Sequence, residues 1–167
     1  MNNIIKKTML LAARLIVFCL AANAQGGRTI YQRYSDMENV NAVYVSQSMF
    51  RIIGRIPDLN LPTGDVNLVP LIKTLTGLYL INSRDAGISK NLMIDAMNFV
   101  RSEKFELMME MKEDGNTAHI YTQGKNGTVS NFVFLSLSGS ECTFISLDGQ
   151  MPEKELEDLL GKAIANL

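Results

Sequence analysis

Residues 105–147, FELMMEMKEDGNTAHIYTQGKNGTVSNFVFLSLSGSECTFISL, decide the fold class of this 167-residue chain. The segment begins with apolar side chains that alternate with mostly charged ones, which is the period-two pattern of a half-buried β-strand. Asp114-Gly115-Asn116 and Asn126-Gly127 then supply residues that accept the positive φ of tight hairpin turns. The stretch therefore predicts four consecutive strands joined by short turns: Phe105–Lys112, Thr117–Gln123, Val129–Leu137 and Cys142–Leu147.

The third of these strands is apolar on both sides, and such a strand is normally central in its sheet. Alternation predicts that one side carries Val129, Val133, Leu135 and Leu137, and we expect helices to cover that side. The other side would then be an aromatic face.

That aromatic face is the candidate binding surface. Its predicted members come from the second and third strands, with Phe144 of the fourth strand alongside: His119, Tyr121, Phe132 and Phe134. Contiguous aromatic side chains on an uncovered sheet face commonly mark a binding site. The alternative is that the N-terminal segment, with Tyr31 and Tyr34, folds over these aromatics as a second layer.

The rest of the chain alternates helical and strand patterns. The predicted elements are a short helix at Thr29–Asn39, a strand at Val40–Ser46, a helix at Gln47–Ile56, a short helix with Pro70 in its first turn and Asp65 or Asn67 as its cap, a strand at Gly77–Asn82, a helix at Ser89–Ser102, and a final helix opened by Pro152. This order predicts an α+β domain with a mixed or antiparallel sheet of about six strands and helices mainly on one face.

Residues 1–24 have the form of a signal peptide. Two lysines precede an apolar run, Met9–Ala22, and Ala22-Asn23-Ala24 is a small-x-small cleavage site. The run is too short and interrupted for a transmembrane anchor. The bulky Val17-Phe18 pair disfavours lipidation at Cys19. We expect residues 25–167 to be a single domain that is exported, either to the periplasm or out of the cell.

Charge and cysteine content exclude some classes. Loss of the leader removes Lys6, Lys7 and Arg14, so the net charge changes from −1 to −4. A mildly acidic chain without a basic stripe lacks the electrostatic footprint for nucleic acid. Cys142 is the only cysteine after residue 24, so no intramolecular disulfide is expected, and it reads as a small buried hydrophobe.

Three short motifs stand in a recognisable order: Tyr34-Ser35, Val43-Tyr44-Val45-Ser46 and Met49-Phe50. Followed by the strand at Gly77–Asn82 and the four-strand stretch, they resemble domain-of-unknown-function family 4252, small exported proteins of Bacteroidetes-type bacteria. The resemblance covers most of residues 25–167. It implies a cell-envelope setting and transfers no activity or site residue.

Residues for catalysis or metal binding are not arranged in a usable set. His119 is the only histidine, and one strand separates it from Cys142 in the predicted order, so their backbones lie about 9–10 Å apart at roughly 4.8 Å per strand. One His and one Cys do not make a typical zinc site. We predict no catalytic residue, no metal and no cofactor.

The leading interpretation is a non-enzymatic envelope protein that binds a protein or peptide partner, with its oligomeric state left open. The alternative is a small-ligand carrier or sensor with an aromatic-lined pocket between sheet and helices. A hydrolase that uses His119 and Cys142 is the third hypothesis.

Overall fold

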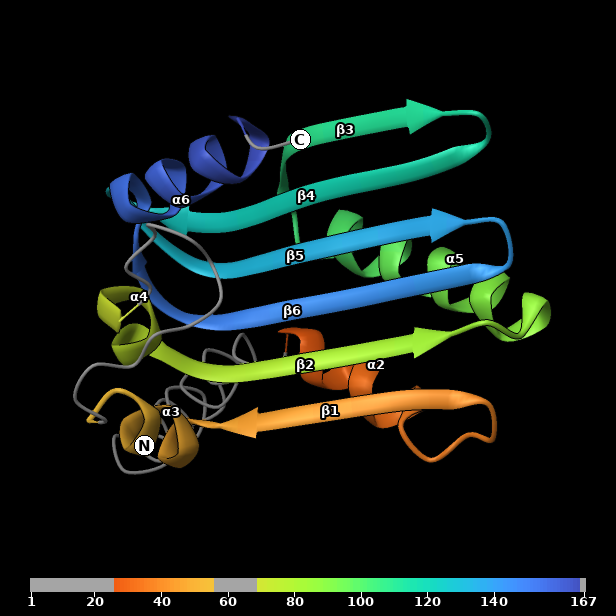
Figure 1. Cartoon of the computed structure of the whole chain (residues 1–167), viewed down its shortest axis with the longest axis horizontal. Helices are drawn as coiled ribbons and strands as arrows, with labels where there is room; N and C mark the ends of the chain where they lie inside the picture. Colours follow the sequence, from red (N-terminus) through yellow and green to blue (C-terminus); the bar gives the residue numbers. More distant parts are fainter. Residues whose placement is uncertain (1–25, 56–68, 166–167) are drawn as a thin grey trace, which may run out of the picture.

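The computed structural model describes residues 26–55 and 69–165, which form one sheet and five helices (Figure 1). In chain order the elements are α2 (Gly26–Tyr34), β1 (Val40–Ser46), α3 (Gln47–Ile53), α4 (Val69–Thr74), β2 (Leu75–Ser83), α5 (Ala86–Ser102), β3 (Glu106–Glu113), β4 (Asn116–Lys125), β5 (Thr128–Ser138), β6 (Glu141–Pro152) and α6 (Glu153–Ala165). The predicted leader, the capping residues Asp65 and Asn67, and the loop between α3 and α4 lie outside the described residues.

The sheet has six strands in the order β1-β2-β6-β5-β4-β3, and all neighbours are antiparallel. The α+β prediction is therefore confirmed, and β5 has the interior position that its two apolar sides require. Asn126 (φ 55°) and Gly127 (φ 73°) both take the left-handed conformation in the β4–β5 hairpin. That conformation is what a type I′ turn demands of its two central residues.

Two helices, α2 and α5, cover one side of the sheet, which we call the covered face. They lie behind the strands in Figure 1. Ile30 and Tyr34 of α2 pack there with Leu92, Ala96 and Val100 of α5. The strands contribute the other members of this core: Ile81, Tyr121, Val133, Leu135, Cys142 and Phe144. The main core thus lies between the sheet and these two helices.

The opposite side, which we call the open face, carries α3, α4 and α6 at one end of the strands, near the β4–β5 hairpin (Figure 1). Phe50, Leu71 and Leu156 of these helices join a second apolar cluster with Phe132 and Met151. Helices therefore lie on both faces, although only the covered face has helices along the length of its strands. Pro70 lies in the first turn of α4, as the sequence predicts.

A β-bulge changes the predicted faces of β5. Ser130 pairs with neither neighbour, because Val129 pairs with Gly124 and Met151 while Asn131 pairs with Gln123 and Asp148. One extra residue shifts the alternation by one position. The prediction that Val129 shares a face with Val133 and Leu135 is therefore wrong, and Val129 packs beside Phe132.

Among the described residues, no helix combines the length and the apolar character needed to cross a membrane.

Candidate functional site

The open face carries an apolar row that crosses all six strands, which we call the central row. Cross-strand pairing connects its members one after another. From the β1 edge to the β3 edge they are Val43, Leu80, Ile145, Phe134, Ile120 and Met109. Side chains directly opposite each other on adjacent strands share a face, so the row is continuous. Five strand spacings of about 4.8 Å make it roughly 24 Å long.

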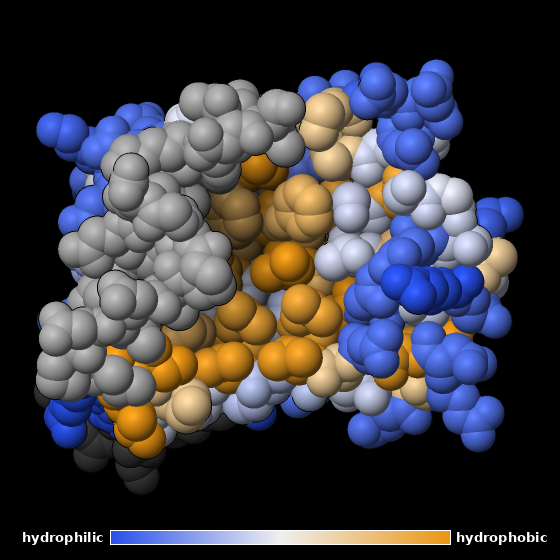
Figure 2. All heavy atoms as spheres, viewed as in Figure 1, coloured by the Kyte–Doolittle hydropathy of each residue, from blue (hydrophilic) through white to orange (hydrophobic). Residues whose placement is uncertain are grey.

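Polar and apolar rows border the central row on its two sides. Toward the helices α3, α4 and α6 lie Val45, Leu78, Leu147 and Phe132, which belong to the second apolar cluster or pack against it. Toward the other end lie Asn41, Asn82, Thr143 and Ser136 on β1, β2, β6 and β5, and the row continues with the apolar Ala118 and Met111 on β4 and β3. Figure 2 shows this arrangement as apolar side chains over the middle of the sheet, with hydrophilic residues toward the β3–β4 and β5–β6 turns. The central row is thus an apolar strip with a polar border.

Most of the central row is only partly buried. Val43 is 47% exposed, Ile120 is buried, and the remaining members lie between these two. No described helix spans the open face in the way that α5 spans the covered face. Among the described residues, the middle of the strip therefore carries no helical layer.

The structure separates the four residues of the predicted binding surface. Phe132 and Phe134 lie on the open face, as expected. His119 pairs with Leu135 and Tyr121 pairs with Val133, so both lie on the covered face. Phe144 lies there as well and is fully buried. The expectation of one shared aromatic face is wrong in this respect.

The error came from the relative register of β4 and β5. Each strand alternates as predicted over this stretch, but a one-residue change of register moves a strand's side chains to the other face. The α2 segment does not cover Phe132 and Phe134, because its Ile30 and Tyr34 pack into the core of the covered face.

His119 is a buried residue near the β3 edge of the covered face. Its Nε2 lies 3.1 Å from Glu110 Oε1, and its ring stacks on Tyr121 with 5.9 Å between centroids. Hydrogen bonds from Lys112 and then from His119 lower the pKa of Glu110. His119 Nδ1 is buried without a partner among the described residues. The histidine therefore ties β4 to β3 and contacts no nucleophile.

Cys142 is fully buried at the start of β6, on the covered face. Burial raises the pKa of its thiol to about 12. Such a thiol is protonated at neutral pH, whereas nucleophilic catalysis needs the thiolate. The prediction of a small buried hydrophobe fits this environment.

A polar cavity of about 660 Å³ opens at the end of the covered face that lies beside the β4–β5 hairpin. Its wall includes Asp148, Asn131, Gln123, Glu103 and Lys125, and none of the described residues that line it is aromatic. Asn131 Nδ2 donates a 2.9 Å hydrogen bond to Asp148 Oδ1. Burial raises the pKa of Asp148, and the hydrogen bond from Asn131 offsets only part of that effect. The cavity is thus built around a partly buried carboxylate.

No sequence pattern predicted this cavity. In the sequence Gly149 indicates a turn after a strand that ends at Leu147, whereas β6 continues to Pro152. The strand can continue here because residue 149 is a glycine. A β-carbon at this position would lie only 2.6 Å from Thr74 O, so a larger residue would push the two backbones apart. The close approach of two backbones explains this glycine better than a turn does.

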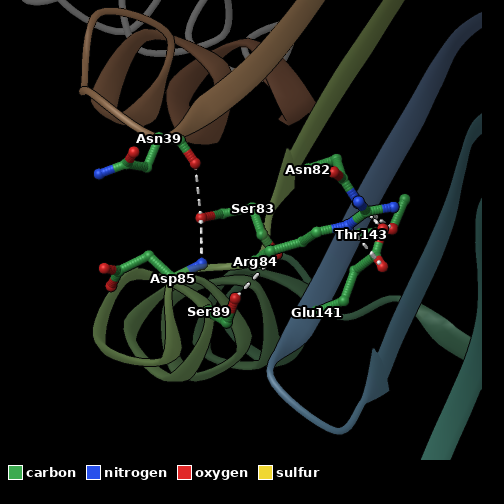
Figure 3. Close-up of polar contacts among 8 residues, drawn as sticks. All are labelled: Asn39, Asn82, Ser83, Arg84, Asp85, Ser89, Glu141 and Thr143. Atoms are coloured by element: carbon green, nitrogen blue, oxygen red, sulfur yellow. Dashed lines mark hydrogen bonds and ion pairs between the residues drawn. The ribbon is translucent and has the colours of Figure 1, made fainter.

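A polar cluster joins three segments of the chain at the opposite end of the sheet (Figure 3). Ser83 Oγ donates to Asn39 O at 2.9 Å and accepts from Asp85 N at 3.2 Å. Ser89 Oγ donates to Ser83 O at 2.9 Å. These bonds connect the end of β2 to the chain before β1 and to the first turn of α5. The role of these residues is structural, because their polar atoms form hydrogen bonds with one another.

The same end of the sheet holds an ion pair. Arg84 Nε lies 3.1 Å from Glu141 Oε2, and Asn82 Nδ2 donates to Glu141 Oε1 at 2.8 Å. Hydrogen bonds from Asn82 and then from Arg84 lower the pKa of Glu141. Among the described residues, no three His, Cys, Asp or Glu side chains are grouped in a way that could hold a metal ion.

Comparison with known proteins places the chain in a family. Residues 34–159 match the family described as Domain of unknown function (DUF4252), and the chain belongs to that family. No functionally curated protein matches it. The crystal structure of a protein of unknown function, PA94, from Pseudomonas aeruginosa is similar at 12% identity over 78% of this chain and 81% of that chain, with a TM-score of 0.31. A likeness at that TM-score carries no functional information.

Proposed function

We propose that this chain is an exported cell-envelope protein that acts without catalysis and binds an apolar segment of a protein or peptide partner on the open face. The central row carries this proposal. Monomeric proteins rarely expose a contiguous apolar patch of this kind unless it binds something. A row of six apolar side chains, with polar residues along one border on β1, β2, β6 and β5, suits an amphipathic segment that lays its apolar side on Leu80, Ile145 and Phe134.

Export is the second part of the proposal. Its support is the signal-peptide pattern of residues 1–24, with an uninterrupted domain after it. The periplasm and the extracellular space both fit this pattern. A precursor expressed in its native host should lose its first 24 residues, and N-terminal sequencing of the envelope fraction reads the cleavage point directly.

Photo-crosslinking in cells tests the binding surface. A photoreactive amino acid at Phe134 should give one dominant protein adduct, and the same amino acid at Asn98, which is exposed on α5 behind the sheet, should give none. Adducts from both positions, or adducts only to the protein itself, would contradict the proposal.

A pair of variants then tests the energetics of the same surface. Ile145→Gln makes the middle of the central row polar, whereas Ser136→Ala changes the bordering polar row by one small group. We expect Ile145→Gln to remove the adduct formed at Phe134 and Ser136→Ala to keep it. The melting temperature of each variant must be measured beside it, because loss of the adduct has meaning only for a folded protein.

The polar cavity beside Asp148 favours a second candidate function, that of a carrier or sensor for a small polar ligand. Its volume is within the range typical of ligand pockets, about 300–1,000 Å³. It differs from the aromatic-lined pocket that the sequence suggested, since aromatic rings fill the space between sheet and helices. Melting curves against peptidoglycan fragments and sugars test this candidate: a saturable rise that Asp148→Ala abolishes supports it, because a ligand that binds only the folded state stabilises that state.

A further inference from the structure

The two edges of the sheet differ in chemistry. The β3 edge has the sequence ELMMEMKE, with four charged residues, and a register shift interrupts its pairing between Leu107 and Met109. The β1 edge has the sequence VNAVYVS, with no charged residue and no proline, and its pairing with β2 runs without a shift from Val40 to Ser46. Charges and bulges are the usual devices that stop an edge strand from pairing with another chain. The β3 edge has both devices, and the β1 edge has neither.

Exposed apolar side chains also gather at the β1 edge. Nine large apolar residues are exposed among those that the structure describes, and five of them fall within residues 37–52: Met37 before β1, Val43 and Tyr44 on β1, and Met49 and Ile52 on α3. Three others lie on β3, beside its charged residues: Leu107, Met108 and Met111. Val43 is 47% exposed on the open face, and Tyr44 is 51% exposed on the covered face. Both sides of the strand therefore present apolar surface, and β1 is the last described strand of the sheet on this side (Figure 1).

We propose that β1 pairs antiparallel with β1 of a second copy of this chain, around a twofold axis at Val43. In this register Val43 faces Val43 of the partner subunit on the open face. On the covered face, Ala42 of each subunit lies opposite Tyr44 of the other subunit. Such an interface is isologous, and it closes as a dimer because each edge is used once.

Three features of β1 favour a second copy over an unrelated strand. The strand carries no charge, so like charges do not meet across the axis. Tyr44 would lie opposite the small Ala42, which leaves room for the ring. The ring is already held in place within its own subunit, since it stacks on Tyr79 with 5.2 Å between centroids and contacts Tyr31 at 6.0 Å. A pre-ordered aromatic side chain loses little conformational entropy on association.

The pairing also extends the surface described above. Val43 ends the central row at the β1 edge, so two rows would join at the axis into one apolar strip across both subunits. The inference does not depend on the proposed function, since a dimer through β1 can form whether or not the open face binds a partner.

The mass of the exported, purified protein in solution tests the proposal. We expect a dimer by analytical ultracentrifugation. Val43→Lys should halve the mass, because it places two ammonium groups at the axis, and its circular dichroism should match that of the wild type because Val43 is half exposed. Met108→Lys is the matched control on the β3 edge, where the side chain is 45% exposed, and it should leave the dimer intact.

A crosslinking experiment makes the test independent of the lysine variants. Isotopically light and heavy protein, each with a photoreactive amino acid at Tyr44, are mixed and irradiated. Mixed light–heavy adducts to the peptide that contains Ala42 support the proposed register. A monomeric wild type, a dimer that Val43→Lys leaves intact, or adducts to the β3 edge would each overturn it.

Discussion

Gly27 of α2 lies directly against Ser146 of β6, so close that a β-carbon at Gly27 would collide with the Ser146 side chain. Ser146 is itself fully buried in the covered face. The distance between the first turn of α2 and the sheet is therefore set by the absence of a side chain at residue 27. This contact holds the helix over the middle of the sheet.

Gly27→Ala should destabilise the protein for this reason. Overpacking costs about 1–3 kcal/mol, which outweighs the gain of up to about 1 kcal/mol in helix propensity. Gly161→Ala in α6 is the control, because nothing lies within 4 Å of its β-carbon position and only the gain applies. Urea denaturation measures both free energies of unfolding, and equal stability of the two variants would show that α2 can move away from β6.

Asp148 should make stability depend on pH in a defined direction. Its pKa is raised in the folded protein, so the folded state holds the proton more tightly than the unfolded state does. The resulting stability is fully present below the unfolded value of 3.8 and is lost as pH rises through the folded value.

Asp148→Asn removes this dependence. The variant keeps an oxygen that can accept the hydrogen bond from Asn131, and it carries no charge to bury. We expect its melting temperature to exceed that of the wild type by a few degrees at pH 7, with the difference vanishing below pH 3.8. A variant that is less stable than the wild type at pH 7 would show that the carboxylate has a favourable partner.

Tyr34 and Asp95 connect the two helices of the covered face, and this contact should show the opposite pH dependence. The Tyr34 hydroxyl donates a 2.7 Å hydrogen bond to Asp95 Oδ2, and Arg33 Nη1 lies 2.6 Å from the same oxygen. Burial alone would raise the pKa of Asp95, but the hydrogen bonds from Tyr34 and Arg33 outweigh it and lower the pKa. A lowered pKa gives stability above the unfolded value that is lost as pH falls through the folded value.

Tyr34→Phe should therefore cost about 1.5 kcal/mol at neutral pH, which is the lower end of the range for a hydrogen bond to a charged group, because the site is partly exposed. The cost should begin to shrink as the pH falls below 3.8, the ordinary pKa of an aspartate, because the unfolded state then takes up a proton that the folded state binds less readily. Chemical denaturation at pH 7 and at pH 3 measures the difference. If Tyr34→Phe costs the same free energy at both pH values, the cost comes from packing of the ring and not from the hydrogen bond to Asp95.

Local pattern predicted the elements of this fold well. The alternation of β3, the Asn126-Gly127 turn and the apolar character of β5 predicted the run of strands, and the family resemblance was correct. The order of the strands was not available from pattern, because β2, which has β1 on its other side, pairs with β6, the last strand of the meander in sequence. Pairing between strands that are far apart in sequence depends on tertiary packing, which the local residue pattern does not encode.

The candidate site, too, was predicted only where it depends on local pattern, and not where it depends on pairing between strands. Phe132 and Phe134 occupy the expected face because alternation within one strand is local. His119 and Tyr121 do not share it, because the register between β4 and β5 depends on a bulge at Ser130 that no residue pattern marks. The central row was not predicted as a unit, since its six members come from six strands and only the sheet order brings them together.

Ser83 provides a test of the polar cluster that fixes the start of α5. Its side chain is 1% exposed, and it both donates to Asn39 O and accepts from Asp85 N. Ser83→Ala would leave two backbone groups without this partner, and an unsatisfied buried polar group costs about 1–3 kcal/mol. Ser102→Ala is the control, because its hydroxyl bonds the Phe99 carbonyl at an exposed site where water can replace it. Hydrogen exchange should show faster opening at the first turn of α5 in Ser83→Ala alone, and unchanged protection there would mean that the Asp85 cap, with its 2.9 Å bonds to Gly87 N and Ile88 N, holds the helix start by itself.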